Sequence, residues 1–237
     1  MLDRLVIIPT YNEKENIRTA LEAVMVNEPV FDVLVVDDNS PDGTAELVEK
    51  IQLEHPGRIH MLQRTEKSGL GTAYIAGFKW ALEKGYEYIF EMDADMSHDP
   101  KDLVRLYKAC AEQGADLSVG SRYTKGGKVK DWPLNRIMMS YFASVYVRMV
   151  LWLGVTDTTA GFVCYKRKVL ETIELDNIQF VGYAFQIEMK YKAKQNGFKI
   201  KEVPITFIDR QIGESKMSMG IFKEAFWGVL QMRFSKT

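Results

Sequence analysis

The first half of the chain alternates short apolar runs with longer segments of helical periodicity, and this alternation restricts the fold more than any other feature. The apolar runs, rich in β-branched residues, are expected as strands at 5–9, 31–38, 58–63, 86–93 and 115–121. Helical patterns lie between them at 14–25, 43–52, 71–85 and 100–114. Strands that alternate with helices of this length predict βαβ units, so we expect a mostly parallel sheet covered by helices on both faces.

The second half has a different pattern. It is expected to contain a basic, glycine-containing loop at 121–133, a long apolar helix at 134–154, a strand-like segment at 161–167, a helix at 183–196, a strand pair or edge at 198–207, a loop at 209–218 and a last helix at 221–234. No repeat, low-complexity tract or Pro/Ser-rich linker interrupts the sequence. We therefore expect one domain over residues 1–237, with helices appended to an α/β first half.

Composition excludes several classes of protein. The chain is 46% hydrophobic, enough for a core, and its 31 basic and 32 acidic residues give no bias toward nucleic acid. No window has the 18 or more uncharged apolar residues of a membrane-spanning helix, and the N-terminal apolar run is too short for a signal peptide. Cys110 and Cys164 lie among apolar neighbours and are expected as buried free thiols in a reducing compartment, which favours the cytosol.

Polar residues collect where the expected strands end, and in open parallel sheets ligands bind beyond the carboxyl ends of the strands. Strand by strand, these residues are Pro9, Tyr11 and Glu13; Asp37, Asp38 and Asn39; Asp93, Asp95 and Ser97; and Ser121 and Arg122. No G-x-G-x-x-G fingerprint follows the first strand and no P-loop follows any strand, which excludes both of those nucleotide sites.

Asp93 and Asp95 are spaced i, i+2, so both side chains point to the same side of a strand that continues straight. Two neighbouring carboxylates require a proton or a shared cation, and oxygen ligands in a wet site suit Mg²⁺ or Mn²⁺. A solvated loop with capping acids is the alternative for an isolated D-x-D pattern. The position of these acids at the end of a buried strand favours a metal site.

Five ordered blocks carry a family resemblance: IIPTYNE, VVDDNSPDGT, LGTA (70–73), DADMSHDP and DRQIGESK. Over residues 4–218 the chain resembles the inverting glycosyltransferases of family 2, and within them the dolichyl-phosphate or polyprenyl-phosphate mannose synthases. The resemblance implies a GT-A-like, Rossmann-type α/β fold with C-terminal amphipathic interface helices. It also implies a nucleotide-sugar-binding half at 1–121 and an acceptor and membrane-interface half at 122–237.

The function that the resemblance implies is transfer of mannose from GDP-mannose to polyprenyl phosphate with inversion. The alternatives are transfer of glucose or another sugar to polyprenyl phosphate, or a family 2 transferase acting on a glycan hydroxyl. A third alternative is a non-catalytic, membrane-associated module that binds a nucleotide. The presence of both Asp93 and Asp95 argues against this alternative.

The resemblance also implies roles for single residues. The nucleotide sugar would contact Pro9, Tyr11, Glu13, Val36, Asp38, Asp93, Ala94, Asp95, Arg210 and Lys216. The metal, Mg²⁺ or Mn²⁺, would be held by Asp93, Asp95 and Ser97, where many relatives have Gln in place of the serine.

The expected catalytic residues are Asp95, Arg210 and Lys216. The side chains of Arg210 and Lys216 would neutralise the diphosphate, and Gly213 would let their loop bend. The acceptor phosphate would be held by Arg122, Arg136 and Ser140. His98 is expected as a loop residue, and Asp157 could orient the acceptor or the sugar.

A basic segment precedes and enters the long apolar helix. Residues 121–148 contain six basic residues and one acidic residue. A helix that is apolar on most of its circumference is often a core element, but beside a basic loop it is also typical of a membrane interface. We therefore expect peripheral association with the cytoplasmic face of a membrane through residues 121–154, aided by the last helix or by a small membrane-anchoring partner.

Overall fold

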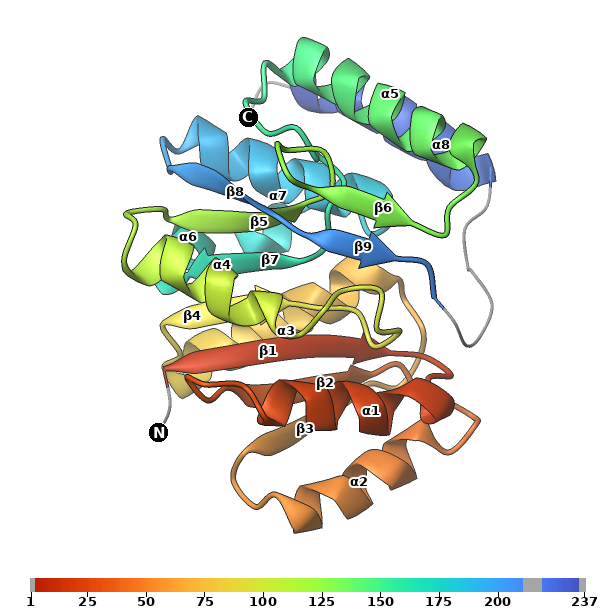
Figure 1. The fold of residues 1–237 in the computed structure, drawn as a ribbon, viewed down its shortest axis with the longest axis vertical. Coiled ribbons are helices and arrows are strands. Elements are labelled where there is room, and N and C mark those ends of the chain that lie inside the picture. Colours follow the sequence, from red (N-terminus) through yellow and green to blue (C-terminus); the bar gives the residue numbers. More distant parts are fainter. Residues whose placement is uncertain (1–2, 211–218, 235–237) are drawn as a thin grey trace.

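A seven-stranded sheet runs through the computed structural model, which describes residues 3–210 and 219–234 (Figure 1). Its strands are β1 (Arg4–Thr10), β2 (Asp32–Asp37), β3 (Ile59–Gln63), β4 (Tyr88–Glu91), β5 (Leu117–Ser121), β7 (Val163–Lys166) and β8 (Ile200–Pro204). A second, two-stranded sheet pairs β6 (Lys128–Lys130) with β9 (Thr206–Ile208). The helices are α1 (Lys14–Met25), α2 (Thr44–Glu54), α3 (Leu70–Lys84), α4 (Asp102–Ala111), α5 (Leu134–Leu151), α6 (Arg167–Thr172), α7 (Tyr183–Gln195) and α8 (Met219–Phe234), with a 3₁₀ turn at Leu175–Asn177.

The strand order in the large sheet is β3-β2-β1-β4-β7-β5-β8. Strands β3, β2, β1 and β4 pair in parallel, as do β5 and β8, whereas β7 is antiparallel to both of its neighbours. The prediction of a mostly parallel α/β sheet is confirmed. Both halves of the chain contribute strands to it, and the assignment of residues 1–237 to one domain stays a prediction.

Alternate residues of the central strands enter different cores. Leu5 and Ile7 of β1 face the core built by α3, α6 and α7, whereas Val6 and Ile8 face the core built by α1, α2 and α4. Figure 1 accordingly shows α1 and α4 in front of the sheet and α3 behind it. A strand buried on both faces explains the uninterrupted apolar runs in the sequence.

Three local predictions need correction. The helix expected at 134–154 ends at Leu151, because Trp152 adopts a left-handed conformation with φ of 52°. The expected basic loop at 121–133 contains β6, whose pairing with β9 has no signal in the local pattern. Helix α4 covers Asp102–Ala111, so it is shorter at both ends than the predicted helix at 100–114. Cys110 and Cys164 are buried free thiols, as predicted.

Helices α5 and α8 lie side by side beyond β8 and the β6–β9 pair (Figure 1). Tyr146 of α5 stacks on Phe226 of α8, with ring centroids 4.8 Å apart, and donates a hydrogen bond to the Phe226 carbonyl at 3.1 Å. Within the described parts of the chain, no helix has the length and apolarity needed to cross a bilayer.

Candidate active site

The carboxyl ends of β1, β2 and β4 are level with one another, and this brings most of the predicted donor-site residues to one edge of the sheet. Pro9 pairs with Val36 in the strand register. The backbone N–H of Asp38 donates to the Thr10 carbonyl at 3.0 Å, and that of Met92 donates to the Ile7 carbonyl at 3.1 Å. The strand ends therefore place three predicted groups together, namely Tyr11 and Glu13, Asp38, and Asp93, Ala94 and Asp95.

Arg210 reaches this edge from the segment after β9. Its Nη2 and Nε donate to Oδ2 of Asp95 at 2.7 and 3.1 Å, and Nη2 lies 3.6 Å from Oε1 of Glu13. Loss of hydration, followed by the charge of Asp95, raises the pKa of Asp93 above its usual range. Burial acts on Asp95 in the same direction, but hydrogen bonds from Arg210 and the Ser97 backbone lower its pKa overall. The carboxyl groups of Glu13 and Asp95 thus lie within 4 Å of the Arg210 guanidinium, and Asp93 lies close enough for the Arg210 charge to lower its pKa.

Two neighbouring carboxyl groups, Asp93 and Asp95, of which the second raises the pKa of the first, fit a divalent cation. Among the residues that the structure describes, no three His, Cys, Asp or Glu side chains form a preformed cage for a metal ion. Asp93 and Asp95 would therefore supply only part of a coordination shell, as is usual for Mg²⁺ with phosphate oxygens. Ser97 is buried, and its backbone N–H donates to Asp95 Oδ1 at 3.0 Å. Its direct ligation of a metal stays a prediction. Lys216 and Gly213 lie outside the described residues.

Asp38 belongs to a hydrogen-bonded chain that sequence reasoning missed. Arg64 Nη1 donates to Asp38 Oδ1 at 2.9 Å, and Arg64 Nη2 donates to Thr72 Oγ1 at 2.8 Å. Burial raises the pKa of Asp38, while the Arg64 charge and the Ser68 backbone N–H oppose the rise. Thr72 lies in the LGTA block at the start of α3. The block thus contributes to the orientation of Asp38, which only the tertiary contacts reveal.

Asp157 binds Arg122 through both carboxylate oxygens. Arg122 Nε donates to Asp157 Oδ2 at 2.7 Å, and Nη2 donates to Oδ1 at 2.7 Å and to Thr159 Oγ1 at 3.0 Å. The Arg122 backbone N–H adds a third bond to the same carboxylate at 2.9 Å. Asp157 is fully buried; burial would raise its pKa, but the Arg122 charge and hydrogen bonds lower it overall. The observed partner of Asp157 is therefore an arginine predicted to bind the acceptor.

Arg136 has a similar arrangement with Asp209. Its Nη1 lies 3.0 and 3.2 Å from the two carboxylate oxygens of Asp209, and its guanidinium lies 4.0 Å from the centroid of the Trp132 ring. Ser140 lies one helical turn after Arg136 on α5. Asp209 directly precedes Arg210, so two adjacent residues connect the predicted acceptor group to the predicted donor group.

His98 has the structural position expected of it. The ring is buried, stacks on Phe162 with centroids 4.8 Å apart, and meets the edge of Phe207 at 5.3 Å. Burial lowers the pKa of His98 to about 4, so the imidazole is neutral at physiological pH. The described contacts of this ring are packing contacts with Phe162 and Phe207.

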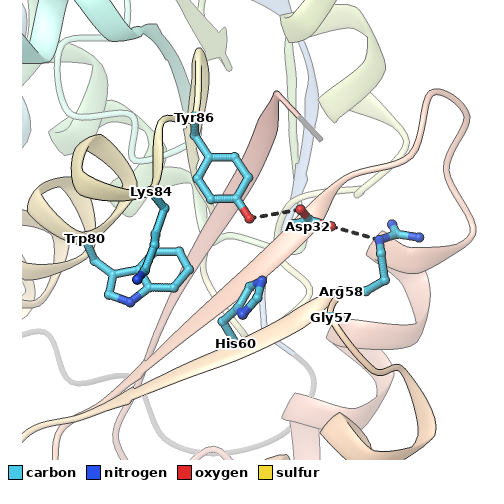
Figure 2. Close-up of a pocket in the computed structure, with 7 residues that line it drawn as sticks. All are labelled: Asp32, Gly57, Arg58, His60, Trp80, Lys84 and Tyr86. Atoms are coloured by element: carbon cyan, nitrogen blue, oxygen red, sulfur yellow. Dashed lines mark hydrogen bonds and ion pairs between the residues drawn. The ribbon is translucent and has the colours of Figure 1, made fainter. Parts of the chain in front are cut away.

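A cavity lined by described residues lies away from this edge. It has a volume of about 870 Å³ and is lined by Asp32, Gly57, Arg58, His60, Trp80, Lys84 and Tyr86. In Figure 2, Tyr86 and Arg58 both meet Asp32, the first residue of β2. The cavity is therefore at the amino ends of the strands, opposite the predicted site, and it contains none of the predicted site residues.

Comparison with known proteins agrees with this geometry. Residues 5–174 match the domain described as Glycosyl transferase family 2. The chain belongs to glycosyl transferase family 2. It is 49% identical over 230 residues to "Polyprenol monophosphomannose synthase" of Mycolicibacterium smegmatis, covering 95% of this chain and 86% of that protein. It is also 49% identical over 230 residues to "Undecaprenyl-phosphate mannosyltransferase" of Micrococcus luteus, covering 95% of this chain and 93% of that protein.

Solved structures support the fold. The glucosyl-3-phosphoglycerate synthase of Mycobacterium tuberculosis, in complex with Mn²⁺, uridine diphosphate and glucosyl-3-phosphoglycerate, superposes with a TM-score of 0.71 at 16% identity. The match covers 100% of this chain and 81% of that one. The same enzyme with Mn²⁺, UDP-glucose and glycerol 3-phosphate gives a TM-score of 0.69. At this identity the likeness shows the fold, so the predicted GT-A-like architecture is confirmed.

The predicted family is therefore confirmed, and so is the prediction that the chain is a glycosyltransferase. The resemblance to polyprenyl-phosphate mannose synthases is supported by two relatives of nearly full coverage. The roles of the individual site residues stay predictions.

Proposed function

We propose that this family 2 enzyme transfers a mannosyl group from GDP-mannose to a polyprenyl phosphate, with inversion at the anomeric carbon. The names of the two relatives at 49% identity support a polyprenyl phosphate acceptor and a mannosyl donor. The observation that carries the proposal in the structure is the pairing at Asp209 and Arg210. One residue pairs with Arg136 and the next with Asp95, so groups for the acceptor and for the donor meet at one point of the chain.

The donor side supports departure of a diphosphate. Glu13, Asp93 and Asp95 surround Arg210, and Mg²⁺ or Mn²⁺ bound beside the carboxylates would supply positive charge to the diphosphate oxygens. In this proposal Arg210 exchanges Asp95 for the diphosphate when the nucleotide sugar binds. A guanidinium suits this exchange because its planar fork forms paired hydrogen bonds with carboxylate and phosphate alike.

The acceptor side needs orientation more than a base. A phosphate monoester has a second pKa of about 6, so the attacking oxygen is largely deprotonated at neutral pH. Arg122 and Arg136 would bind this dianion, and Asp157 would hold the Arg122 guanidinium in a fixed orientation. Direct attack on the anomeric carbon, in line with the departing diphosphate, inverts the configuration. The chain's own contribution is therefore alignment and charge stabilisation.

The surface of α5 and α8 supports peripheral binding to a membrane. The large apolar side chains exposed there are Leu134, Met138, Met139, Tyr141, Phe142, Met149, Trp152, Phe226, Trp227 and Phe234. On α5 most of them recur every three or four residues, whereas the opposite face packs inward through Ser144, Val147 and Leu151. Exposed large apolar side chains gathered on one helix face are typical of an interaction site. We propose that this surface lies in the headgroup region of the cytoplasmic leaflet, together with the basic residues of segment 121–148.

Two substitutions test which side each arginine serves. Arg136→Ala should weaken use of polyprenyl phosphate and spare nucleotide binding, whereas Arg210→Ala should slow turnover and weaken GDP binding. Each removes a charge-assisted pair worth ~1.5–3 kcal/mol, so roughly a ten- to hundredfold change is expected. Calorimetry with GDP and Mg²⁺ measures the donor side, and kinetics against short-chain polyprenyl phosphate measures the acceptor side. If Arg136→Ala weakened GDP binding as much as Arg210→Ala and left acceptor kinetics unchanged, the acceptor assignment would be wrong.

The sugar and the base need a separate test. A panel of nucleotide sugars with polyprenyl phosphate, read by product mass, should give a hexosyl product with GDP-mannose. A product with UDP-glucose alone would replace the mannosyl proposal by glucosyl transfer on the same fold. Analysis of the anomeric configuration of the product then tests inversion.

A further inference from the structure

The loop after β3 lies against Asp38, the residue predicted to contact the nucleotide base. The Arg64 backbone N–H donates to the Asp37 carbonyl at 2.8 Å, and the Arg64 side chain donates to Asp38 Oδ1 at 2.9 Å. The Ser68 backbone N–H also lowers the pKa of Asp38. The start of this loop is thus held against the carboxyl end of β2 by Arg64. Lys67 lies within this stretch.

Lys67 covers the ring on which a base is expected to pack. Its Nζ lies 4.2 Å from the centroid of the Tyr11 ring, while the lysine itself is exposed to solvent. A cation–π contact at an exposed site is weak, so an aromatic base can displace the ammonium from the ring at little cost. The displaced ammonium remains on a loop anchored to Asp38, and it therefore stays beside whatever binds at Tyr11.

We propose that Lys67 is a specificity-determining residue that donates a hydrogen bond to a carbonyl oxygen of the nucleotide base, next to the ring N–H that Asp38 accepts. The inference rests on the proposed donor site and identifies which groups read the base. It concerns a residue outside the five sequence blocks that carry the family resemblance.

The chemistry of the two side chains defines the class of base. An ammonium only donates hydrogen bonds and an ionised carboxylate only accepts them. Guanine and uracil present a carbonyl oxygen next to a ring N–H, which complements this pair. Adenine and cytosine present an amino group next to a bare ring nitrogen, which reverses the pattern. The site should therefore bind guanine more tightly than adenine, and uracil more tightly than cytosine.

Calorimetry with GDP, ADP, UDP and CDP, each with Mg²⁺, tests the inference on the full chain. The nucleotides form a purine pair, GDP and ADP, and a pyrimidine pair, UDP and CDP; the first of each pair has the carbonyl and the second the amino group. In the pair that the wild-type protein binds more tightly, the carbonyl-bearing nucleotide should have the higher affinity. Lys67→Met should weaken binding of the carbonyl-bearing nucleotide about tenfold and leave the amino-bearing one unchanged, because one charged hydrogen bond is lost. Lys50→Met is the matched control, since Lys50 is an exposed lysine on α2 and its loss changes the net charge equally.

The outcomes separate this inference from the proposed function. Preference of the wild-type protein for UDP over GDP would overturn the GDP-mannose donor, and the UDP and CDP pair would still test Lys67. Equal weakening of both members of a pair by Lys67→Met would show that Lys67 contacts the phosphates, and the inference would be wrong. Unchanged binding of the carbonyl-bearing nucleotide in Lys67→Met would overturn it as well. A wild-type protein that bound none of the four would overturn both.

Discussion

Replacement of Asp157 by asparagine tests whether its ion pair with Arg122 holds the predicted acceptor site together. The carboxylate is fully buried, accepts three hydrogen bonds from Arg122, and faces a guanidinium whose side chain is 10% exposed. Asparagine keeps the size of the side chain, removes its charge and turns one acceptor into a donor facing the N–H groups of Arg122. The variant therefore removes the buried negative charge that faces the Arg122 guanidinium.

The expected magnitude follows from that burial. Removing one partner of a buried ion pair costs about 3–5 kcal/mol, and the acceptor oxygen that asparagine retains favours the lower end, about 3 kcal/mol. In a domain of this size each kcal/mol lowers Tm by roughly 2–4 °C, so the melting temperature should fall by about 6–12 °C. If Arg122 binds the acceptor, KM for polyprenyl phosphate should also rise, with GDP binding retained.

Thermal unfolding measured at several pH values gives the decisive comparison. The pKa of Asp157 is lowered in the folded protein, so its stabilisation is complete above the unfolded pKa of about 3.9 and is lost as pH falls through the folded pKa. The difference in Tm between the wild-type protein and Asp157→Asn should be constant above about pH 5 and narrow in more acidic solution. Glu54→Gln is the control, because it breaks an Arg–carboxylate pair with Arg18 that is largely exposed and should leave Tm close to that of the wild type.

Two results would refute this reasoning. If Asp157→Asn and Glu54→Gln had the same Tm, the buried ion pair would contribute no more to the stability of the folded protein than the surface pair does. If Tm fell as expected but acceptor KM stayed unchanged while GDP binding weakened, Arg122 would belong to the donor site.

Three further perturbations have definite expectations. Asp95→Asn should lower turnover about a hundredfold with the fold intact, because an amide cannot replace the charge that binds Mg²⁺ or Mn²⁺. EDTA should abolish the activity of the wild-type protein. Near-normal activity of the variant would contradict the metal site. Phe142→Ser should reduce flotation of the protein with anionic vesicles, and added salt should weaken the wild-type binding, whereas binding indifferent to salt and lipid charge would exclude the basic segment as the contact. Gly71→Ala should lower Tm, because the added Cβ would lie 2.9 Å from the Phe185 ring. Gly154→Ala is the control and should have little effect, because a Cβ added there would meet no atom within 4 Å. Equal Tm values for the two variants would contradict the packing argument.

Local pattern was sufficient for the first half of the fold. Helix α1 has the predicted bounds 14–25, and each predicted strand from β1 to β5 is present with ends shifted by a few residues at most. The reason is physical: strands buried on both faces need unbroken apolar runs, and amphipathic helices need their own period. The D-x-D acids could be placed at the sheet edge because the carboxyl ends of parallel strands share that edge.

Pairings between distant segments were decided by the tertiary structure. Nothing in the sequence of β7 indicates that it enters the sheet antiparallel between β4 and β5, because both directions bury the same side chains. The exposure of α5 could not be read from its composition either, since a helix that is apolar on most sides is equally suited to a core.

The sequence by itself determined which charged residues this protein carries and at which strand ends they stand. The structure decided their partners: Arg122 with Asp157, Arg136 with Asp209, Arg210 with Asp95, and Arg64 with Asp38. These residues are separated by 26 to 115 positions. An ion pair depends on distance and burial in space, and neither quantity is contained in the local periodicity from which secondary structure is predicted.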